Sequence, residues 1–484
     1  MRKNRYITIL CLLTWIFASQ ATVKLPSIFS DGIVLQQNSK VAIWGKATPK
    51  STVTVQTTWN NSTYTAKVTS DSTWRVNVVT LGAGGPYAIS ISDGNPVKIN
   101  NVLLGEVWLA SGQSNMEMPL KGFKDQPVKD SEHYISQSKN DQIRFFDVEN
   151  VSWKRPLDNC NGQWKSANPT NAVNFSAVAY LFAQNLYNQL NVPVAIIESD
   201  WGGTPVEAWM NGETLDGYAA VKVPKESNTS NTDKKTPAGL YNAMIHPLVG
   251  YGIKGVIWYQ GEQNRDNPAL YLKLFPAMVK QWRSEWGIGD FPFYYAQIAP
   301  YIFKKTTNLP DNIKELMPKV PVLRETQLLS EKKIKNSGMA VLLDVGEEKT
   351  IHPSDKKSVA DRLFYFAKAK TYNFKDTKYA SPVYSKMKTD KNKIILSFEN
   401  VEEGLMFKDG ISQNFEIAGA DQVFYPAKAR IMSGNEIAVW ADNVTKPVAV
   451  RYAFKAWVVG DLFNSAGFPA SSFRTDKWKI PSKQ

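Results

Sequence analysis

The strongest constraint on the fold of this chain is a buried strand that leads directly into a turn. Residues Glu106 to Ser111 are predicted to form that strand, and Gly112-Gln113-Ser114-Asn115 follow it. A strand-to-helix turn of this kind exposes one hydroxyl, here Ser114, where backbone N–H groups converge, as a serine nucleophile requires. Met116 replaces the second glycine of the G-x-S-x-G pattern, so an ordinary α/β-hydrolase turn is disfavoured. Helix capping is the alternative role for this serine.

Alternating strands and helices follow this turn as far as about residue 380. This pattern indicates an α/β domain with a mainly parallel sheet, which binds ligands where its strands end. The irregular segments 141–171 and 215–237, including a polar loop at 228–235, are interpreted as insertions that shape the pocket rim. The strands are predicted at 192–198, 253–259, 291–298 and 339–344, and the helices at 175–190 and 354–370.

The chain on either side of this domain is predicted to be β-rich. Short alternating segments separated by turn residues indicate an N-terminal β-sandwich over 22–104. Period-two alternation returns in 381–484 and predicts a β-rich C-terminal lobe. A chain of 484 residues is too long for one ordinary core, which agrees with a catalytic α/β domain at 105–380 between these two parts.

Residues 1–21 have the layout of a secretory signal peptide. Basic residues at Arg2, Lys3 and Arg5 precede an apolar run and then small residues, and no later stretch is long and apolar enough to insert into a membrane. We therefore expect a periplasmic or secreted protein. Cys160 is the single cysteine left after the leader, so no internal disulfide can form, which favours a bacterial source.

The charge of the chain limits its partners. The formal net charge is +13, and removal of the three basic leader residues makes it +10. The Lys and Arg residues are scattered, so no nucleic-acid partner is predicted, whereas a mild cationic field favours an anionic substrate. The oligomeric state is left open.

Several motifs resemble those of the sialate O-acetylesterase family, a branch of the SGNH-type serine esterases that includes acetyl xylan esterases. The resemblance covers nearly the whole mature chain and implies an SGNH-hydrolase-like α/β domain with Ser114 as the nucleophile. It also implies removal of O-acetyl groups from glycans through an acetyl-enzyme, with O-acetylated sialic acids as the favoured substrates. The motifs are Phe29-Ser30-Asp31-Gly32, Val41-Ala42-Ile43-Trp44-Gly45, Gly112-Gln113-Ser114-Asn115-Met116, Trp258-Tyr259-Gln260-Gly261-Glu262 and Ile351-His352-Pro353.

Other functions remain as alternatives. Acetylated xylan or another plant glycan would serve the same chemistry. A non-catalytic glycan-binding protein is a second alternative, although such a protein needs neither a nucleophile nor a base. A peptidase with the same triad is a third. No cofactor is expected, and no metal site, because the sequence has neither a phosphate-binding glycine loop nor a His-x-x-x-His pair.

A serine nucleophile requires a base, and the chain has only three histidines. His133 lies in a polar segment and is predicted to be a surface residue. His246 lies among apolar residues and is predicted to be a hydrogen-bonded core histidine. His352 follows a strand and precedes a helix, so it is the candidate base.

The acid of the triad is assigned from the resemblance. In related acetyl xylan esterases the Glu of Gln-Gly-Glu is the acid, which implies Glu262 here. Many relatives have an acidic residue directly before the Ile-His pair, but this chain has Lys349-Thr350 there. Glu348 and Asp344 therefore remain as alternatives.

The oxyanion hole and the substrate pocket are expected to lie near these residues. The Ser114 N–H is one oxyanion donor, and Gly202 and Gly203 are expected to supply another because the backbone of a glycine can approach the substrate closely. SGNH-type enzymes add a side-chain amide, for which Gln260 is the first choice and Asn264 the second. The aromatic residues beside these motifs that are expected to line the pocket are Trp201, Trp209 and Tyr259.

Overall fold

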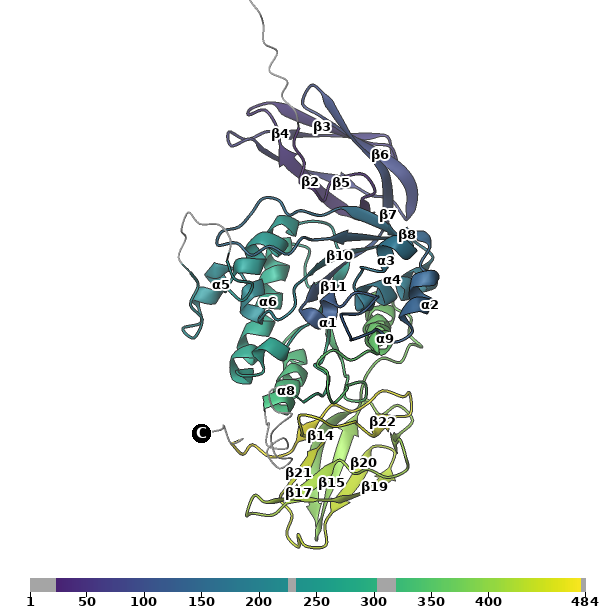
Figure 1. Ribbon diagram of the computed structural model, residues 1–484, viewed down its shortest axis with the longest axis vertical. Coiled ribbons are helices and arrows are strands. Elements are labelled where there is room, and N and C mark those ends of the chain that lie inside the picture. The colour runs from purple at the N-terminus through teal and green to yellow at the C-terminus, as the bar shows by residue number, and fades with distance from the viewer. Residues whose placement is uncertain (1–22, 225–231, 303–318, 480–484) are drawn as a thin grey trace, which may run out of the picture.

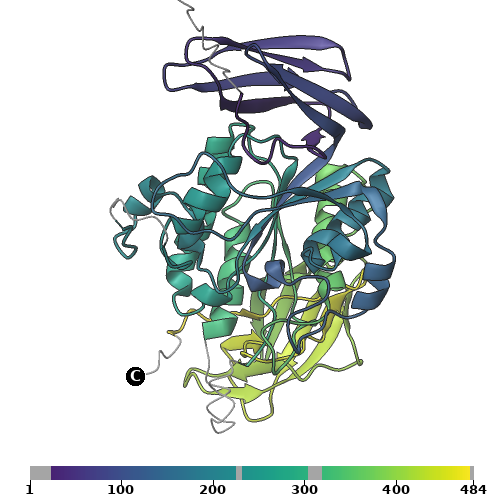
Figure 2. The same ribbon diagram turned by 45° about the horizontal axis from the view of Figure 1, so that its top comes forward.

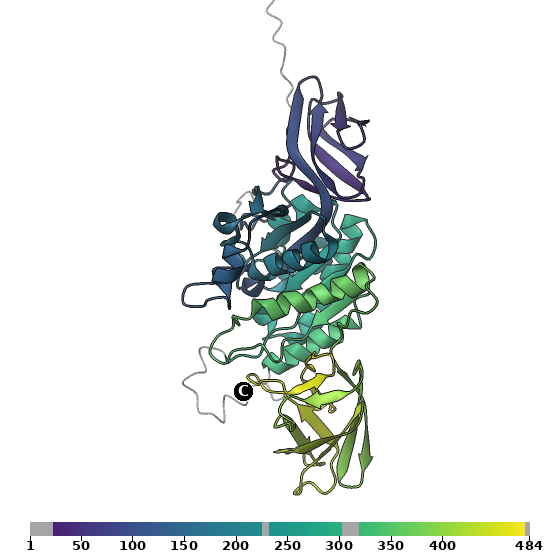
Figure 3. The ribbon, with the colours of Figure 1, turned by 90° about the vertical axis from the view of Figure 1, so that its right-hand side faces the viewer.

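The computed structural model describes residues 23–224, 232–302 and 319–479. The predicted signal peptide and residues 228–231 of the predicted polar loop lie outside the described residues. Three parts follow one another along the long axis of the molecule: an N-terminal β-rich part, a central α/β part and a C-terminal β-rich part (Figure 1, Figure 3).

The N-terminal part consists of short strands, most of them antiparallel. Strand β2 pairs with β5, while β3 lies between β4 and β6 in a second group of strands. These strands alternate between buried and exposed side chains, which explains the period-two pattern of the sequence. The strands are β1 (Val34–Gln36), β2 (Lys40–Lys46), β3 (Thr52–Thr57), β4 (Ser62–Lys67), β5 (Thr73–Val79) and β6 (Gly84–Ser92).

One long strand joins this part to the central sheet. Strand β7 covers 17 residues, Pro96–Gly112. Its first half pairs with β6 and β1, and its second half pairs in parallel with two strands of the central sheet. The predicted boundary between residues 104 and 105 therefore falls inside a continuous strand. That strand connects the two parts rigidly, because its ladder hydrogen bonds continue through the boundary.

The central sheet has the order β13-β12-β11-β7-β10-β8-β9. All neighbours are parallel except β9, which is antiparallel to β8. The predicted α/β fold is thus confirmed as a large mixed sheet with helices. The strands added here are β8 (Asn140–Asp147), β9 (Trp164–Ala167), β10 (Val194–Asp200), β11 (Gly255–Tyr259), β12 (Phe293–Ala296) and β13 (Ser337–Ala340).

Two details differ from the sequence predictions. The segment 141–171 is not a wholly irregular insertion, because it contributes part of β8 and all of β9 to the sheet. Its register is irregular between Asn140 and Arg144, which hides the period of the strand. Strand β13 also ends at Ala340, before most of the predicted strand 339–344.

Helices cover both faces of the sheet (Figure 1, Figure 2). On one face lie α4 (Ala177–Leu190) and α9 (Lys356–Phe366), whose apolar side chains share a core with Trp108, Ile196 and Ile257. On the other face lie α6 (Pro268–Trp286) and α8 (Lys319–Glu331), next to Trp258 and Phe293. Because successive strand residues face opposite sides, Ile257 and Trp258 belong to different cores.

The C-terminal part contains two four-stranded antiparallel sheets and a two-stranded one. One sheet has the order β14-β15-β20-β19 and the other β18-β17-β21-β23. The strands are β14 (Val383–Asp390), β15 (Lys393–Glu399), β16 (Leu405–Phe407), β17 (Phe415–Ala418), β18 (Phe424–Pro426), β19 (Lys428–Ser433), β20 (Glu436–Trp440), β21 (Ala449–Tyr452), β22 (Leu462–Asn464) and β23 (Phe473–Arg474).

Candidate active site

Ser114 lies at the end of β7, in the middle of the parallel sheet. It begins the short helix α1 (Ser114–Glu117) and is half-buried. The preceding Gly112 has φ +144°, and a Cβ at this position would lie 2.2 Å from the carbonyl oxygen of Tyr259. Only glycine allows the chain to pass this close to β11. The turn is fixed there by a 2.9 Å hydrogen bond from the Gln113 N–H to the same oxygen.

His352 lies within hydrogen-bond distance of Ser114. Its Nε2 is 2.8 Å from Ser114 Oγ, and its Nδ1 is 2.8 Å from Gln126 Oε1. An amide oxygen can only accept, so Nδ1 carries the proton and Nε2 has a free lone pair. The lone pair accepts the hydrogen bond from the Ser114 hydroxyl, which is the orientation that a general base requires. The structure therefore brings the predicted nucleophile and the predicted base together.

Gln126 was not identified from the sequence. It closes a tight turn in which the N–H and carbonyl of Phe123 and Gln126 pair with each other at 3.0 Å. Gln126 Oε1 accepts a second hydrogen bond, from Thr350 Oγ1 at 3.1 Å, and the Phe123 ring packs edge-on against the imidazole of His352. No motif marks this glutamine, since its role depends on how the turn folds over the His352 loop.

The structure corrects the expected position of the triad acid. Both ring nitrogens of His352 have partners, and neither partner is a carboxylate. Glu262, the expected acid, instead accepts a 2.6 Å hydrogen bond from Asn115 Nδ2. Asp344 is held by Arg362 at 2.7 Å, and Glu348, the other alternative, is likewise not the partner of Nδ1. Glu262 is thus hydrogen-bonded to Asn115 and not to the imidazole.

A buried polar network lies beneath the nucleophile. Asn115 donates to Glu262 and to the carbonyl of Ile351 at 3.0 Å, and its Oδ1 accepts from Lys356 Nζ at 2.6 Å. Glu262 is 2% exposed and Lys356 is fully buried. Asn115 therefore bridges two buried opposite charges and also holds the backbone next to His352.

Burial controls the protonation of these groups. Desolvation, followed by the positive charge of Lys356, lowers the pKa of His352 to about 4. Desolvation also lowers the pKa of Lys356 to about 7, against the attraction of Glu262. The pKa of Glu262 is raised by its burial. His352 is consequently a neutral base at physiological pH.

The glycine turn after β10 lies next to Ser114. Gly203 has φ +75°, and its N–H, like that of Ser114, has no hydrogen-bond partner within the described residues. The N–H of Gly202 is already bound to Glu117 Oε2 at 2.8 Å. A Cβ at Gly202 would lie 3.1 Å from Ser114 Cβ, which shows how closely this turn approaches the nucleophile.

The two candidate amide side chains are occupied elsewhere. Gln260 is fully buried, and its Nε2 donates to the Thr204 carbonyl at 3.1 Å and to Asn264 Oδ1 at 2.7 Å. Asn264 in turn donates to Glu207 Oε2 at 2.8 Å. Both amide hydrogens of Gln260 therefore have partners, whereas Asn264 Nδ2 donates one of its two hydrogens to Glu207.

Four carboxyl groups lie close to one another near the turn at Gly202 and Gly203. Glu198 and Asp200 on β10 are buried near Glu117 and Asp147. Desolvation and then the neighbouring carboxylates raise the pKa of both Glu198 and Asp200 well above the usual range. Asp200 Oδ2 has no hydrogen-bond partner within the described residues. Asp200 is therefore stable here mainly as the neutral acid.

The three predicted pocket aromatics differ in exposure. Trp201 is half-buried and lies beneath Lys234, whose Nζ is 5.7 Å from the ring centroid. Trp209 and Tyr259 are fully buried, so they are not free to stack on a sugar. Trp209 instead donates to Thr204 Oγ1 at 3.0 Å and so supports the glycine turn. Lys234 also lies beside Gly203, since a Cβ there would be 3.7 Å from its Nζ.

His133 lies on the surface as predicted, whereas His246, predicted to be a hydrogen-bonded core histidine, has the hydrogen bond but is only half-buried. His133 is exposed on α2 (Ser131–Ser136), and His246 is half-buried with its Nδ1 3.0 Å from the Leu157 carbonyl. Within the three described ranges, no group of three or more His, Cys, Asp or Glu side chains is arranged to hold a metal ion. Among these same residues, no helix is long and apolar enough to cross a membrane.

Comparisons with known proteins agree with this arrangement. Residues 104–338 match the family model of carbohydrate esterases described as sialic acid-specific acetylesterases. The human sialate O-acetylesterase is 30% identical over 471 residues, which cover 90% of this chain and 88% of the human protein. The mouse sialate O-acetylesterase is 28% identical and 90% of each chain is covered.

A solved structure extends the similarity to the fold. A carbohydrate acetylesterase from Xanthomonas citri superposes with a TM-score of 0.84 at 36% identity, and the match covers 94% of this chain and all of that one. The mammalian relatives do not fit the prediction of a bacterial source, which rested only on the absence of disulfides. Identity and coverage together place this chain in the sialate O-acetylesterase family of carbohydrate esterases.

Proposed function

We propose that this enzyme is a serine esterase that removes O-acetyl groups from sialic acids through an acetyl-enzyme intermediate. The observation that carries the proposal is the contact of 2.8 Å between His352 Nε2 and Ser114 Oγ, with the opposite ring nitrogen oriented by Gln126. This arrangement supplies both an activated nucleophile and a base in the correct tautomer. The names of the relatives favour a sialic acid as the acetylated sugar.

The reaction begins with proton transfer from Ser114 Oγ to His352 Nε2 as Oγ attacks the acetyl carbonyl carbon. The carbonyl oxygen becomes an oxyanion, which the free N–H groups of Ser114 and Gly203 stabilise. The carbon–oxygen bond to the sugar then breaks, and the imidazolium of His352 returns its proton to the sugar alcohol. Water then gives a proton to the same nitrogen as it attacks the acetyl carbon, and the imidazolium returns that proton to Ser114 Oγ as the acyl–oxygen bond breaks and acetate is released.

A neutral third residue distinguishes this site from a Ser-His-Asp triad. Gln126 fixes the ring and its tautomer, but it has no negative charge with which to stabilise the imidazolium. The imidazolium is further disfavoured by burial and by Lys356, which together lower the pKa of His352 to about 4. We infer that the base remains available well into the acidic range.

Lys234 is the residue that supports an acidic sugar as substrate. Its ammonium lies over Trp201 and beside Gly203, next to the backbone donors of the site. A carboxylate on the sugar could pair with this ammonium while the acetyl carbonyl is held by Gly203 and Ser114. A neutral acetylated xylan lacks that group.

Two further parts of the proposal concern the whole chain. We propose export to the periplasm or outside the cell, on the basis of the leader-like residues 1–21. We also propose the division into a β-sandwich at 22–104, the catalytic domain at 105–380 and a β-rich lobe at 381–484. This division is supported by the β-strands β1 to β6 before the central sheet and β14 to β23 after it.

The test is acetate release from O-acetylated sialic acid and from acetylated xylan, measured side by side for the wild type and Ser114→Ala. The proposal expects release from the sialic acid that the substitution abolishes, with slower release from xylan. Faster release from xylan would assign the substrate to a plant glycan. No release from either would contradict an esterase function.

A further inference from the structure

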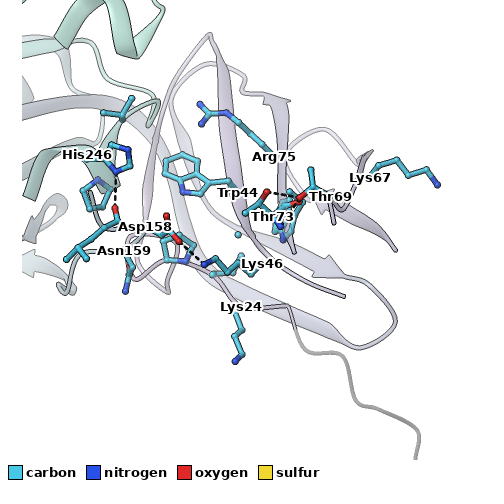
Figure 4. Close-up of a pocket in the computed structure, with 17 residues that line it drawn as sticks. Lys24, Trp44, Lys46, Lys67, Thr69, Thr73, Arg75, Asp158, Asn159 and His246 are labelled. Carbon is cyan, nitrogen blue, oxygen red and sulfur yellow. Dashed lines mark hydrogen bonds and ion pairs between the residues drawn. The ribbon is translucent and has the colours of Figure 1, made fainter. Parts of the chain in front are cut away.

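A second cavity lies between the N-terminal part and the central part, away from Ser114 and His352. It has a volume of about 750 Å³ (Figure 4). Strands β2 and β5 contribute one wall, and the loop at residues 157–159 with the short helix η3 (His246–Leu248) contributes the other. The parts are held together at this point by an ion pair of 2.7 Å between Lys46 and Asp158. The cavity is therefore built by two parts of the chain.

The charge of the lining is strongly one-sided. Lys24, Lys46, Lys67 and Arg75 line the cavity, whereas Asp158 is the only carboxylate among the lining residues. Asp158 is already paired with Lys46, so three cationic side chains remain without compensation in the lining. Such a cavity attracts an anion.

Arg75 is the group for which an anion is most favourable. Its guanidinium lies over the ring of Trp44, 5.1 Å from the centroid, and its Nη2 is 3.4 Å from the Gly250 carbonyl. It forms no ion pair with any described carboxylate, while partial burial lowers its pKa. The Arg75 side chain is exposed, so its guanidinium is accessible to a carboxylate ligand, which can pair with it through bidentate hydrogen bonds.

The rest of the lining suits a sugar ring. Trp44 opposes Arg75 across β2 and β5, so these two side chains share one face of the ladder, and Leu25 and Pro247 extend the apolar surface. Trp44 is held in place by the edge of Phe29, with a centroid distance of 4.6 Å. Aromatic walls with polar groups at fixed positions are typical of small-ligand sites, and the half-buried Trp44 gives a rigid apolar contact.

We propose that this cavity is an ancillary binding site for an acidic saccharide, whose carboxylate pairs with Arg75 and whose ring contacts Trp44. The site is not catalytic, since it contains no nucleophile with an adjacent base. Binding there does not depend on the proposed acetylesterase function. A glycan held in this cavity would raise the local concentration of acetyl groups available to Ser114.

The test is calorimetric titration of full-length Ser114→Ala protein with sialyllactose, with lactose as the matched neutral sugar. Sialyllactose should bind and lactose should bind much more weakly. Arg75→Gln should weaken the binding at this site by about tenfold or more, because a charge-assisted hydrogen bond is lost. Trp44→Ala should also weaken it, and Lys98→Gln, an exposed lysine on β7 outside the cavity, should not.

Binding at the active site is separated by a second measurement. In a Ser114-containing background, Arg75→Gln should hydrolyse 4-nitrophenyl acetate at the wild-type rate, which also shows that the variant folds. Equal affinity for sialyllactose in Arg75→Gln and wild type would overturn the proposal. So would equal affinity for lactose, or the same loss in Lys98→Gln. If the wild type releases no acetate, the proposed esterase function fails, but these binding results still test the cavity as a saccharide site.

Discussion

Replacement of Gln126 by Glu tests the role of the residue that orients the base. Glutamate has nearly the shape of glutamine, so the 2.8 Å contact with His352 Nδ1 and the hydrogen bond from Thr350 can be kept. The change adds one negative charge next to the imidazole. A hydrogen bond to a charged group contributes about 1.5–3 kcal/mol, which corresponds to about 1–2 pKa units. Gln126 is partly exposed, so solvent screening favours the lower figure, about one unit.

The expected direction follows from the form that catalyses the reaction. Only the neutral imidazole accepts the Ser114 proton, so activity falls as the pH drops below the pKa of His352. In the wild type this pKa is about 4. Gln126→Glu raises the pKa of His352, so the acidic limb of the activity profile moves to higher pH by about one unit. The plateau value of kcat should rise as well, because the carboxylate stabilises the imidazolium in the transition state.

The assay is the pH dependence of kcat/KM for 4-nitrophenyl acetate, measured for wild type, Gln126→Glu and Gln126→Ala. Gln126→Ala removes the acceptor without adding charge, so kcat should fall by roughly 100-fold as the ring loses its orientation. If the acidic limb of Gln126→Glu coincides with that of the wild type, residue 126 does not control the base and the reasoning is refuted.

Three other substitutions have defined outcomes. Lys234→Met should raise the KM for O-acetylated sialic acid by about tenfold because the ammonium is lost, while the KM for 4-nitrophenyl acetate should not change. Lys235→Met, at the exposed neighbouring lysine, is the control, and equal KM values for the two variants would contradict the prediction. Lys356→Met should lower the free energy of unfolding in urea by about 3–5 kcal/mol, because it leaves Glu262 as an unpaired buried charge. The double variant Lys356→Met/Glu262→Gln should recover part of this loss. The pKa of Asp200 is raised in the folded protein, so its protonated carboxyl stabilises the fold at pH values below the pKa of the unfolded state, and this stabilisation is lost as the pH rises through the pKa of the folded state. Asp200→Asn should therefore unfold at a higher temperature than the wild type at pH 8 but not at pH 4. An equal difference at both pH values would argue against a neutral Asp200.

The contact between Ser114 and His352 could be predicted from the sequence because local signals mark both residues, while their roles as nucleophile and base stay predictions. Ser114 follows a buried strand and Gly112, a position that only glycine fits because the chain passes close to Tyr259. His352 is one of only three histidines in the chain. Parallel strands that are neighbours in the sheet bring the ends of β7 and β10 together, which is why Gly203 also lies at the site.

The remaining residues could not be predicted because their roles depend on tertiary contacts. Gln126 meets His352 only because a turn 12 residues after Ser114 folds over a loop that is 226 residues away in the sequence. Glu262 is hydrogen-bonded to Asn115, whereas the partner of His352 Nδ1 is Gln126, a tertiary contact that no motif indicates. Trp209 and Tyr259 adjoin site motifs in the sequence, yet both are buried in the cores that support the sheet.

The fold shows the same division between local and tertiary signals. The apolar stripe of α4 is local, and the predicted helix agrees with the observed one within two residues. Strand β8 has no comparable signal, because its pairing with β9 is irregular. The continuity of β7 across the predicted domain boundary also depends on pairing with four other strands, which periodicity alone does not reveal.

The central claim, that Ser114 is a nucleophile activated by His352, is tested most directly by covalent labelling. Intact-mass spectrometry after incubation with a fluorophosphonate should show one adduct on the wild type. Ser114→Ala should show none, and His352→Ala should label far more slowly. An adduct of equal yield on Ser114→Ala, or acetate release by a wild-type protein that never labels, would contradict the claim.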